Sequence, residues 1–312
     1  YDAAQRRLEQ RRALEGKEAL RLTKGLSTES YIEAYRATDG QTDSDDFHAA
    51  FQAALERRVN DLPWEVVQDE IQSAKGVAEI VSANVIRGAI ESRVQPVVDE
   101  TGELNAQLAS AVLARHLALR DHMAVRPDVI AVYQAYLDAH HEEKPDIWAA
   151  REVTLTDEDP CDKVLVAVWD SGTVPDVFKD RLWTNPEEQF DGQDTDGNGY
   201  VDDVYGIAYD VNAEKTTGLL YPLGDVEPRI HDVMSHMKGL EDVQASIDSP
   251  DARALKQYIS EMEPTQIKSF LEDLSLAGNY AHGTHVAGIM LRGNPCARLL
   301  IARLSYDYHT IP

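Results

Sequence analysis

Two short apolar runs, far apart in the chain, place the tightest constraint on its fold. Residues 164–169 read Val-Leu-Val-Ala-Val-Trp, and residues 299–304 read Leu-Leu-Ile-Ala-Arg-Leu. Continuous runs of this length that are rich in β-branched residues are typical of strands buried on both faces of a parallel sheet. Because helical patterns separate the two runs, the sequence predicts an α/β domain with a parallel sheet.

Residues 1–150 have a different pattern, which predicts a mostly α-helical N-terminal region. Ser44 is placed to cap a helix in which Phe47, Phe51 and Leu55 fall on one face. We therefore expect these residues to form a helical domain that precedes the sheet.

Residues 151–312 are expected to form the second domain. Within it, residues 183–212 are dense in Asp, Gly and Asn and predict a loop. Helical patterns then return, and Pro250 and Pro264 each follow a residue that can cap a helix, which predicts two helix starts.

The charge of the chain argues against two kinds of partner. Its 55 acidic and 30 basic residues give a net charge of −25. Phosphate binding needs clustered Lys and Arg, so neither nucleic acid nor an anionic membrane surface is expected to bind. No apolar run approaches the roughly 18 residues of a membrane helix, so we predict a soluble chain without a membrane span. Tyr1 stands where a methionine would, which leaves a processed and a truncated start as alternatives.

The segments most suggestive of chemistry lie beside the two apolar runs. Asp170-Ser171-Gly172 follows the first run, and open α/β sheets place their sites at the carboxyl ends of such strands. Residues 282–288 read His-Gly-Thr-His-Val-Ala-Gly, and these small residues let a helix begin directly behind His282. The positive end of the helix dipole disfavours an imidazolium there, so we expect a neutral His282 that accepts a proton as a general base.

Together these segments resemble those of the subtilisin-like serine proteases, the subtilases. Residues 166–172 look like the catalytic-aspartate segment of that family, and residues 282–288 look like its more specific catalytic-histidine segment. The order Asp before His is that of subtilisin, and residues 295–304 resemble the strand after the histidine helix. The resemblance implies a partial subtilisin-like parallel sheet with helices, preceded by the helical region.

The resemblance also implies roles for two residues. Asp170 would orient and stabilise His282 through its Nδ1–H, and His282 would take the proton of a serine hydroxyl that attacks a peptide carbonyl. We therefore predict that the two side chains lie within hydrogen-bonding reach, although 112 positions separate them. His285 is expected to be structural, and the chemistry itself requires no cofactor.

The chain departs from the family at the third catalytic group. The family's serine lies in a Gly-Thr-Ser-Met-Ala-like segment, and no serine here has that context. We therefore expect the N-terminal part of a serine endopeptidase, inactive by itself. Its partners would be a polypeptide substrate and the C-terminal peptidase portion that carries the serine. The alternatives are a non-catalytic pseudoprotease whose helical parts bind a protein, and, more weakly, a calcium-dependent binding module.

Two helical segments differ from the usual pattern of the family. Residues 1–150 do not resemble its small mixed α/β propeptide, which leaves a prodomain and a partner-binding module as alternatives. The interval between the aspartate and histidine segments is also longer than usual, so residues from about 214 to 277 look like a helical insertion beside the cleft. The insertion would either narrow substrate access or decorate the surface.

An acidic stretch suggests a cation site. Residues 194–203 begin with the Asp-x-Asp-x-Asn-Gly pattern of a calcium loop, in which alternate oxygen-bearing side chains curl around a hard cation. A similar stretch is present in one branch of the subtilases, so the pattern is partly a family signature. The alternative to calcium is an acidic hydrogen-bonded turn. The candidate ligands are Asp194, Asp196, Asn198, Tyr200 and Asp202.

Cys161 and Cys296 each stand three residues before an apolar run. In the subtilase sheet these runs are neighbouring parallel strands, which would place the two cysteines about 5 Å apart. The resemblance thus implies a disulfide, and two unrelated buried thiols are the alternative. A disulfide would imply an oxidising compartment, so we expect a secreted or otherwise extracytoplasmic protein.

Overall fold

The computed structural model describes residues 2–142, 146–156 and 158–309. Its contacts divide the chain into two compact units. The helical unit comprises the described residues up to 142 and Lys238–Lys268, and the sheet unit comprises the described residues of 146–237 and 269–309. No helix in the described part of the chain combines the length and the apolarity that a membrane crossing requires.

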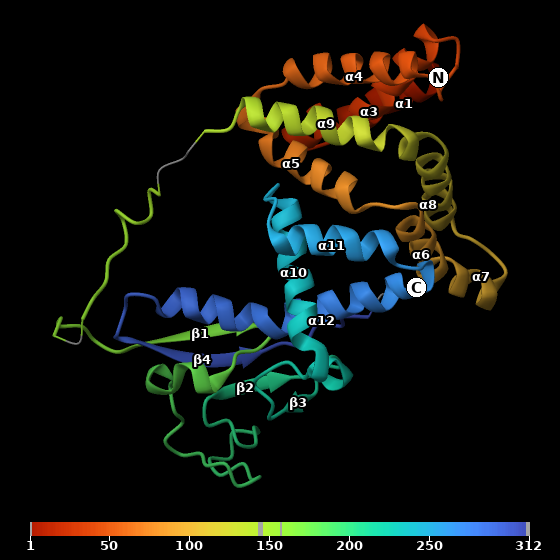
Figure 1. The fold of residues 1–312 in the computed structure, drawn as a ribbon. Helices are drawn as coiled ribbons and strands as arrows, with labels where there is room; N and C mark the ends of the chain where they lie inside the picture. Colours follow the sequence, from red (N-terminus) through yellow and green to blue (C-terminus); the bar gives the residue numbers. More distant parts are fainter. Residues whose placement is uncertain (1, 143–145, 157, 310–312) are drawn as a thin grey trace. The chain divides into compact units, whose positions relative to one another are not determined.

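The first part of the helical unit consists of consecutive helices, as the sequence predicts (Figure 1). The cap at Ser44 is confirmed, because its hydroxyl accepts a hydrogen bond from the backbone N–H of Phe47 at 3.2 Å. The helices are α1 (Asp2–Leu14), α2 (Glu18–Thr23), α3 (Leu26–Ala37), α4 (Asp45–Asn60), α5 (Trp64–Ile80), α6 (Ala83–Arg93), α7 (Gln95–Thr101), α8 (Ala106–Leu117) and α9 (Met123–Ala139), with a π-helical turn at Ala118–His122.

The core of this unit lies between α4 and its neighbours. Phe47, Phe51 and Leu55 are fully buried on one face of α4, as their spacing predicts, and they pack in one cluster with Val67 and Ile71 of α5. Burial of such side chains contributes about 1.5–3 kcal/mol each relative to exposure, which fixes the helices against one another.

Residues from the expected insertion complete the helical unit. The segment comprises α10 (Ile230–Gln244) from Lys238 on, α11 (Pro250–Glu261) and the start of α12 (Pro264–Leu291), as far as Lys268. A Cβ on Gly76 would lie 2.9 Å from the carbonyl oxygen of Val243, and one on Gly88 would lie 2.7 Å from the Cβ of Ile267. The structure therefore assigns much of the segment expected at about 214–277, and with it part of the expected second domain, to the helical unit.

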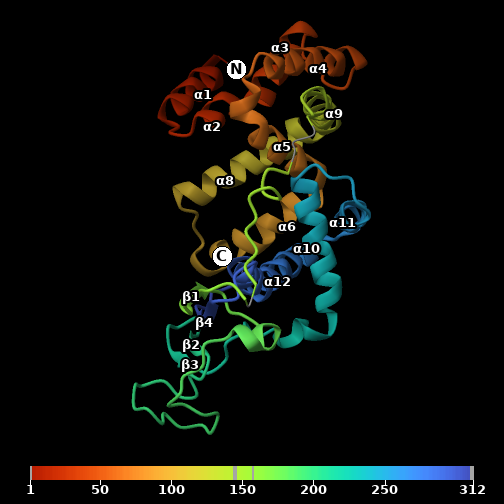
Figure 2. The ribbon, with the colours of Figure 1, turned by 90° about the vertical axis from the view of Figure 1, so that its left-hand side faces the viewer.

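The sheet unit is built on a four-stranded sheet in the order β1-β4-β2-β3 (Figure 2). The strands β1 and β4 are parallel neighbours, which confirms the expected pairing, and β2 is also parallel to β4. Two 3-10 segments accompany the sheet, at Pro175–Arg181 and Gly224–Arg229. The strands are β1 (Val164–Asp170), β2 (Gly206–Tyr209), β3 (Lys215–Thr216) and β4 (Ala297–Arg303).

The strand β2 lies within residues 183–212, which were expected to be a loop, so that expectation is wrong at this point. Its four residues are too few to stand out from the polar stretch before them. Gly206 allows the pairing, because a Cβ there would meet the backbone of Ile301.

One face of the sheet is covered by α12 (Figure 1). Ala287 and Leu291 of this helix share a buried cluster with Val168, and with residues of β4. The other face of β1 is open: Leu165 is 49% exposed and Trp169 72% exposed. The expectation that β1 is buried on both faces is therefore wrong for the described residues, because β1 is an edge strand and α12 packs on one side of it.

Candidate functional site

Asp170 and His282 form a hydrogen-bonded pair at the carboxyl end of β1. Asp170 is the last residue of β1, and its Oδ1 lies 2.7 Å from Nδ1 of His282 on α12. The prediction that these side chains lie within hydrogen-bonding reach is confirmed. The Asp170 side chain is 17% exposed and that of His282 is 67% exposed, so the imidazole is held on one side and open to solvent on the other.

The environment of Asp170 favours its ionised form. Burial raises the pKa of this carboxyl, but hydrogen bonds from His282 and from the backbone N–H of Ser171 outweigh burial, so the pKa lies below its ordinary value. The N–H of Ser171 donates to Oδ1 at 2.7 Å and its hydroxyl donates to the same atom at 3.1 Å. The carboxylate therefore stays charged at neutral pH beside the histidine.

Two hydrogen bonds tie the turn after Asp170 to α12. The backbone N–H of Gly283 donates to the Ser171 hydroxyl at 3.4 Å, and that of Val174 donates to Oγ1 of Thr284 at 3.1 Å. Ser171 is buried, so the first bond is shielded from water. The pair of Asp170 and His282, called the dyad below, therefore lies on a turn and a helix that are hydrogen-bonded to each other.

The position of His282 on its helix differs from the expectation. The helix α12 begins at Pro264 and continues through His282, which lies about five turns from the N-terminus. The effect of the dipole fades within the first turn, so the dipole argument for a neutral His282 is wrong. Residues 274–281 hold no proline, and the single glycine at Gly278 does not end the helix. The hydrogen bond to Asp170 is the interaction that orients His282.

None of the described serines beside the two motifs is placed as a nucleophile. Ser275 precedes His282 by seven positions on α12, which separates them by about 10 Å along the axis. Ser171 bonds Asp170, and the Ser305 hydroxyl donates to the carbonyl of Tyr209. Among the described residues His282 has Asp170 as its hydrogen-bond partner. The family role of nucleophile therefore falls on none of these side chains.

Three carboxylates come together at and beside the acidic stretch, and one of them, Asp196, is a predicted ligand. Oxygens of Glu188, Asp196 and Asp203 lie within 4.8 Å of one another. Glu188 is 5% exposed and Asp203 is 7% exposed. One Glu188 oxygen accepts from the backbone N–H of Thr195 and Asp196, whereas its Oε2 is buried without a hydrogen-bond partner. A buried, unpaired carboxylate oxygen is costly, and a hard cation would satisfy it.

The other predicted ligands are directed elsewhere. Asp194 accepts from the backbone N–H of Asn198 at 3.0 Å, and Asp202 accepts from that of Gly192 at 2.8 Å. The Tyr200 hydroxyl lies 2.5 Å from that of Tyr209. The Asn198 amide donates to Asp196 at 2.9 Å and to Asp203 at 3.0 Å, so it borders the cluster. Glu188 lacks a local spacing signal, because it precedes the pattern by six positions.

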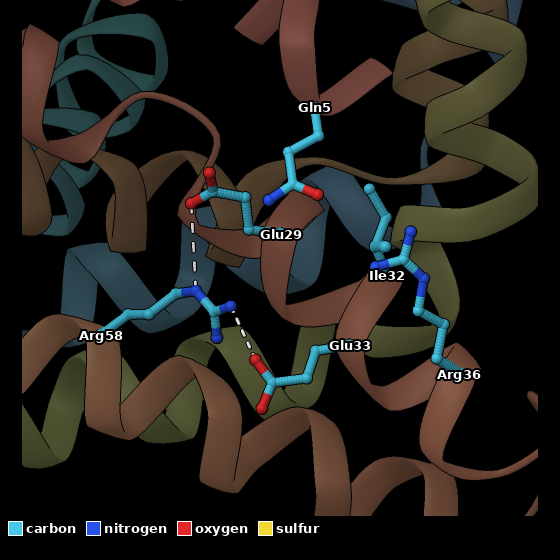
Figure 3. A pocket seen from close by; sticks show the side chains of 6 residues that line it. All are labelled: Gln5, Glu29, Ile32, Glu33, Arg36 and Arg58. Carbon is cyan, nitrogen blue, oxygen red and sulfur yellow. Dashed lines mark hydrogen bonds and ion pairs between the residues drawn. The ribbon is translucent and has the colours of Figure 1, made fainter. Parts of the chain in front are cut away.

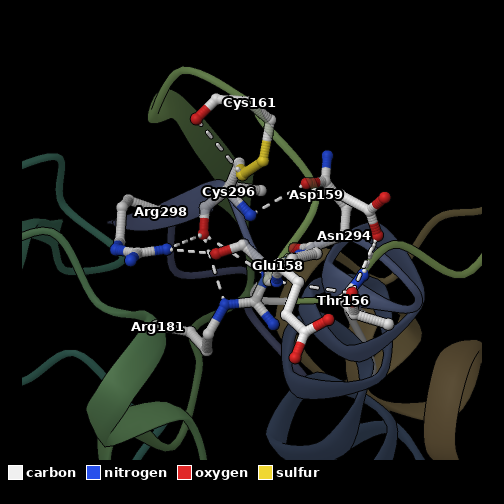
Figure 4. The surroundings of a disulfide bond; sticks show 10 residues. Thr156, Glu158, Asp159, Cys161, Arg181, Asn294, Cys296 and Arg298 are labelled. Atoms are coloured by element: carbon white, nitrogen blue, oxygen red, sulfur yellow. Dashed lines mark hydrogen bonds between the residues drawn. A yellow bond between two sulfur atoms is a disulfide. The ribbon is translucent and has the colours of Figure 1, made fainter.

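The disulfide Cys161–Cys296 is present, which confirms the expected pairing (Figure 4). Its Cα atoms are 6.2 Å apart, and 135 positions separate the two residues. The backbone N–H of Val164 donates to the carbonyl of Cys296 at 3.0 Å, so the bridge continues the ladder between β1 and β4. The bond therefore links the strand that ends in Asp170 to its neighbour at the opposite end.

The helical unit holds a separate cavity of about 220 Å³ (Figure 3). Arg58 lies between Glu29 and Glu33, at 3.9 Å and 2.7 Å, and Arg36 pairs with Asp2. The charges that line the cavity are thus paired with each other and with nearby residues. This accounts for the cluster as an ion-pair network between helices.

Comparison of the chain with protein-family models, with curated proteins and with solved structures returns no match. The residues and their geometry therefore carry the functional assignment.

Proposed function

We propose that this chain is the N-terminal portion of a serine endopeptidase of the subtilisin type. The observation that carries the proposal is the bond between Asp170 and His282. Two segments that resemble the family's aspartate and histidine segments, 112 positions apart, meet through Oδ1 and Nδ1 at 2.7 Å. This is the contact through which an aspartate orients a catalytic histidine.

In the proposed reaction each residue has one task. The carboxylate of Asp170 holds the Nδ1–H of His282, which leaves Nε2 to accept the proton of a serine hydroxyl. The hydroxyl oxygen attacks the peptide carbonyl, and His282 then gives the proton to the leaving amine. Asp170 stabilises the imidazolium between these steps. The pair supplies the base, and a further polypeptide portion supplies the nucleophile and the oxyanion hole.

The surface of β1 supports the need for such a portion. Apolar side chains on a parallel strand are normally covered on both faces, yet Leu165 and Trp169 are exposed in the described chain. The free edge of β1 also presents backbone groups that another strand could pair. We infer that the serine-bearing C-terminal peptidase portion adds a strand at this edge and covers this face. A polypeptide is the proposed substrate.

A structural cation, calcium by its ligand chemistry, belongs to the same proposal. Glu188, Asp196 and Asp203 would bind it, and Asn198, whose amide donates to two of these carboxylates, borders the site. The unpaired Oε2 of Glu188 is the observation that favours a cation over a purely hydrogen-bonded turn. The cation would stabilise the loop and take no part in the reaction.

The alternative is a non-catalytic pseudoprotease or a helical protein-interaction module. One observation favours an interaction role for the helical unit over a removable prodomain. Lys238–Lys268, which follow Asp170 in the chain, belong to this unit. Removal of residues 1–142 would break the ion pair of Lys256 with Glu79 at 3.7 Å and the bond from the Asn84 amide to the carbonyl of Met262. The disulfide suits an extracytoplasmic location, which we propose for either function.

Hydrolysis of a fluorogenic peptide by the protein expressed from its complete reading frame tests the proposal. Asp170→Asn and His282→Ala should each lower kcat by about 10⁴-fold or more, because each removes part of the base. His285→Ala is the matched control, since His285 is exposed and its ring makes no bond to the dyad in the described structure. Equal activity of His282→Ala and His285→Ala would reject the endopeptidase in favour of the alternative.

A further inference from the structure

A cavity of about 510 Å³ opens beside the dyad, within the sheet unit. One wall is a face of α12, because positions 275, 278, 279 and 282 repeat at helical spacing. The wall therefore extends two turns from His282 toward the N-terminus of α12. The lining residues are Asp170, Ser171, Ser275, Gly278, Asn279, His282, Tyr306 and Asp307.

Gly278 is the unusual member of this wall. Glycine inside a helix costs about 1 kcal/mol relative to alanine, so it normally has a packing reason. Gly283, on the same helix, has one, since a Cβ there would meet the backbone of Gly172. Around Gly278, apart from its chain neighbours and the adjacent backbone of its own helix, no described atom lies within 4 Å of an added Cβ. The bare backbone at Gly278 instead leaves room on the cavity side of the helix.

The charge of the lining is negative. Asp170 and Asp307 contribute carboxylates, and the described residues of the lining include no lysine or arginine. The backbone N–H of His309 and then its ring lower the pKa of Asp307, with N–O distances of 2.9 and 2.7 Å. Both carboxyls are therefore ionised at neutral pH, and a cationic group in the cavity would be attracted to them.

We propose that this cavity is a subsite for a lysine or arginine side chain of a bound polypeptide, with the polypeptide backbone passing over Gly278. The inference rests on the proposed function, which brings a polypeptide to this site. The volume is in the range of ligand pockets and holds one long side chain with its backbone. Asn279 is held against the far wall by a bond from its amide to the carbonyl of Tyr306 at 3.2 Å.

Fluorescence anisotropy of labelled short peptides with the 312-residue chain tests the subsite. The peptides are identical except for a central lysine, norleucine or glutamate. We expect the lysine peptide to bind at least about fivefold more tightly than the norleucine peptide, since one partly screened charge pair is worth that factor. Asp307→Asn should remove most of this preference. Asp176→Asn, which changes the net charge equally at an exposed position outside the cavity, should leave it intact.

Gly278→Leu tests whether the peptides need the open space beside Gly278, independently of the negative charge of the cavity. Leucine is a strong helix former, so the variant should fold, and its side chain should weaken the binding of all three peptides about tenfold or more. Circular dichroism and a Gly278→Ala variant, which adds a single methyl group, separate steric blocking from loss of fold.

Two outcomes overturn the subsite: lysine and norleucine peptides that bind equally or not at all, or a lysine preference that survives Asp307→Asn. Its failure differs from failure of the proposed function. Hydrolysis by the complete protein without a cationic preference would reject the subsite alone. A cationic preference in binding, without hydrolysis by the complete protein, would reject the peptidase and leave the subsite standing.

Discussion

Gly283 lies directly against Gly172, with no space for a side chain between them. A Cβ added to Gly283 would meet the carbonyl group of Gly172, and its N at 3.1 Å. Gly172 follows Asp170 by two residues, and Gly283 follows His282. The close approach of these two glycines is therefore what brings the helix bearing His282 onto the turn bearing Asp170.

Gly283→Ala should push α12 away from the turn. We expect it to destabilise the sheet unit by about 1–3 kcal/mol, the usual cost of overpacking, and to weaken the bond between Asp170 and His282. Gly278→Ala is the matched control on the same helix. It has open space around it, so it should stabilise by up to about 1 kcal/mol. Thermal unfolding of both variants checks that Gly283→Ala lowers the melting temperature and that Gly278→Ala does not. Equal changes in the two variants would contradict the close packing of Gly283 on Gly172.

The lowered pKa of Asp170 predicts a pH dependence with a definite sign. Its hydrogen bonds stabilise the ionised form in the folded state, so the contribution to stability is complete above its ordinary value of 3.8. This contribution to stability is lost as the pH falls through the pKa of Asp170 in the folded state, which is the lower of the two values. The difference in melting temperature between the wild type and Asp170→Asn should therefore shrink in acid. A carboxyl that titrates at or above 3.8 in NMR spectra would contradict this.

The sequence predicts β1 and β4 because the physical signal for each strand is local and dense, whereas their pairing followed from the resemblance. Six apolar residues at 164–169 and a matching run at 299–304 have few alternatives to a buried parallel strand. The contact between Asp170 and His282 was predicted from the resemblance, which depends on short segments that occur in a particular order along the chain. The cap at Ser44 was predictable because it requires only neighbours in the chain.

Other features of the fold and of the candidate site depend on contacts between residues far apart in the chain, which the local sequence pattern does not encode. The helix that carries His282 extends back to Pro264 because Gly278, the one glycine before His282 in this helix, costs too little to break it. Glu188 joins the carboxylate cluster through the fold of its loop, without a spacing signal. Lys238–Lys268 join the helical unit through tertiary contacts, such as the bond from the Asn84 amide to the carbonyl of Met262 at 3.1 Å.

The disulfide should stabilise the sheet unit. Closure of a loop of 135 positions is worth about 5 kcal/mol in the chain-entropy model. The double variant Cys161→Ser, Cys296→Ser should therefore melt at a lower temperature, with the dyad less ordered. Mass spectrometry without reduction should find the two cysteines linked. Two thiols that are alkylated without prior reduction, in protein purified under oxidising conditions, would rule the bridge out.

Calcium should raise the melting temperature of the wild-type protein, by an amount that grows with its concentration. At a hundredfold excess over Kd, binding to the folded state alone contributes about 2.7 kcal/mol. Glu188→Gln should abolish the response, because Glu188 supplies the unpaired buried oxygen. Asp202→Asn should retain it, because Asp202 bonds backbone amides instead. Calorimetry without heat on addition of calcium, together with no effect of a chelator, would remove the cation.

Covalent labelling by a fluorophosphonate probe tests the endopeptidase account most directly, because the probe reacts with a serine that a neighbouring base has activated. The protein from the complete reading frame is treated with the probe, and the labelled peptide is identified by mass spectrometry. If Asp170 and His282 form the base, one serine outside the described chain is labelled in the wild type, His282→Ala abolishes the labelling, and His285→Ala retains it. Labelling that is absent from the wild type, or that persists in His282→Ala, would contradict the assignment of Asp170 and His282 as the base of a serine peptidase.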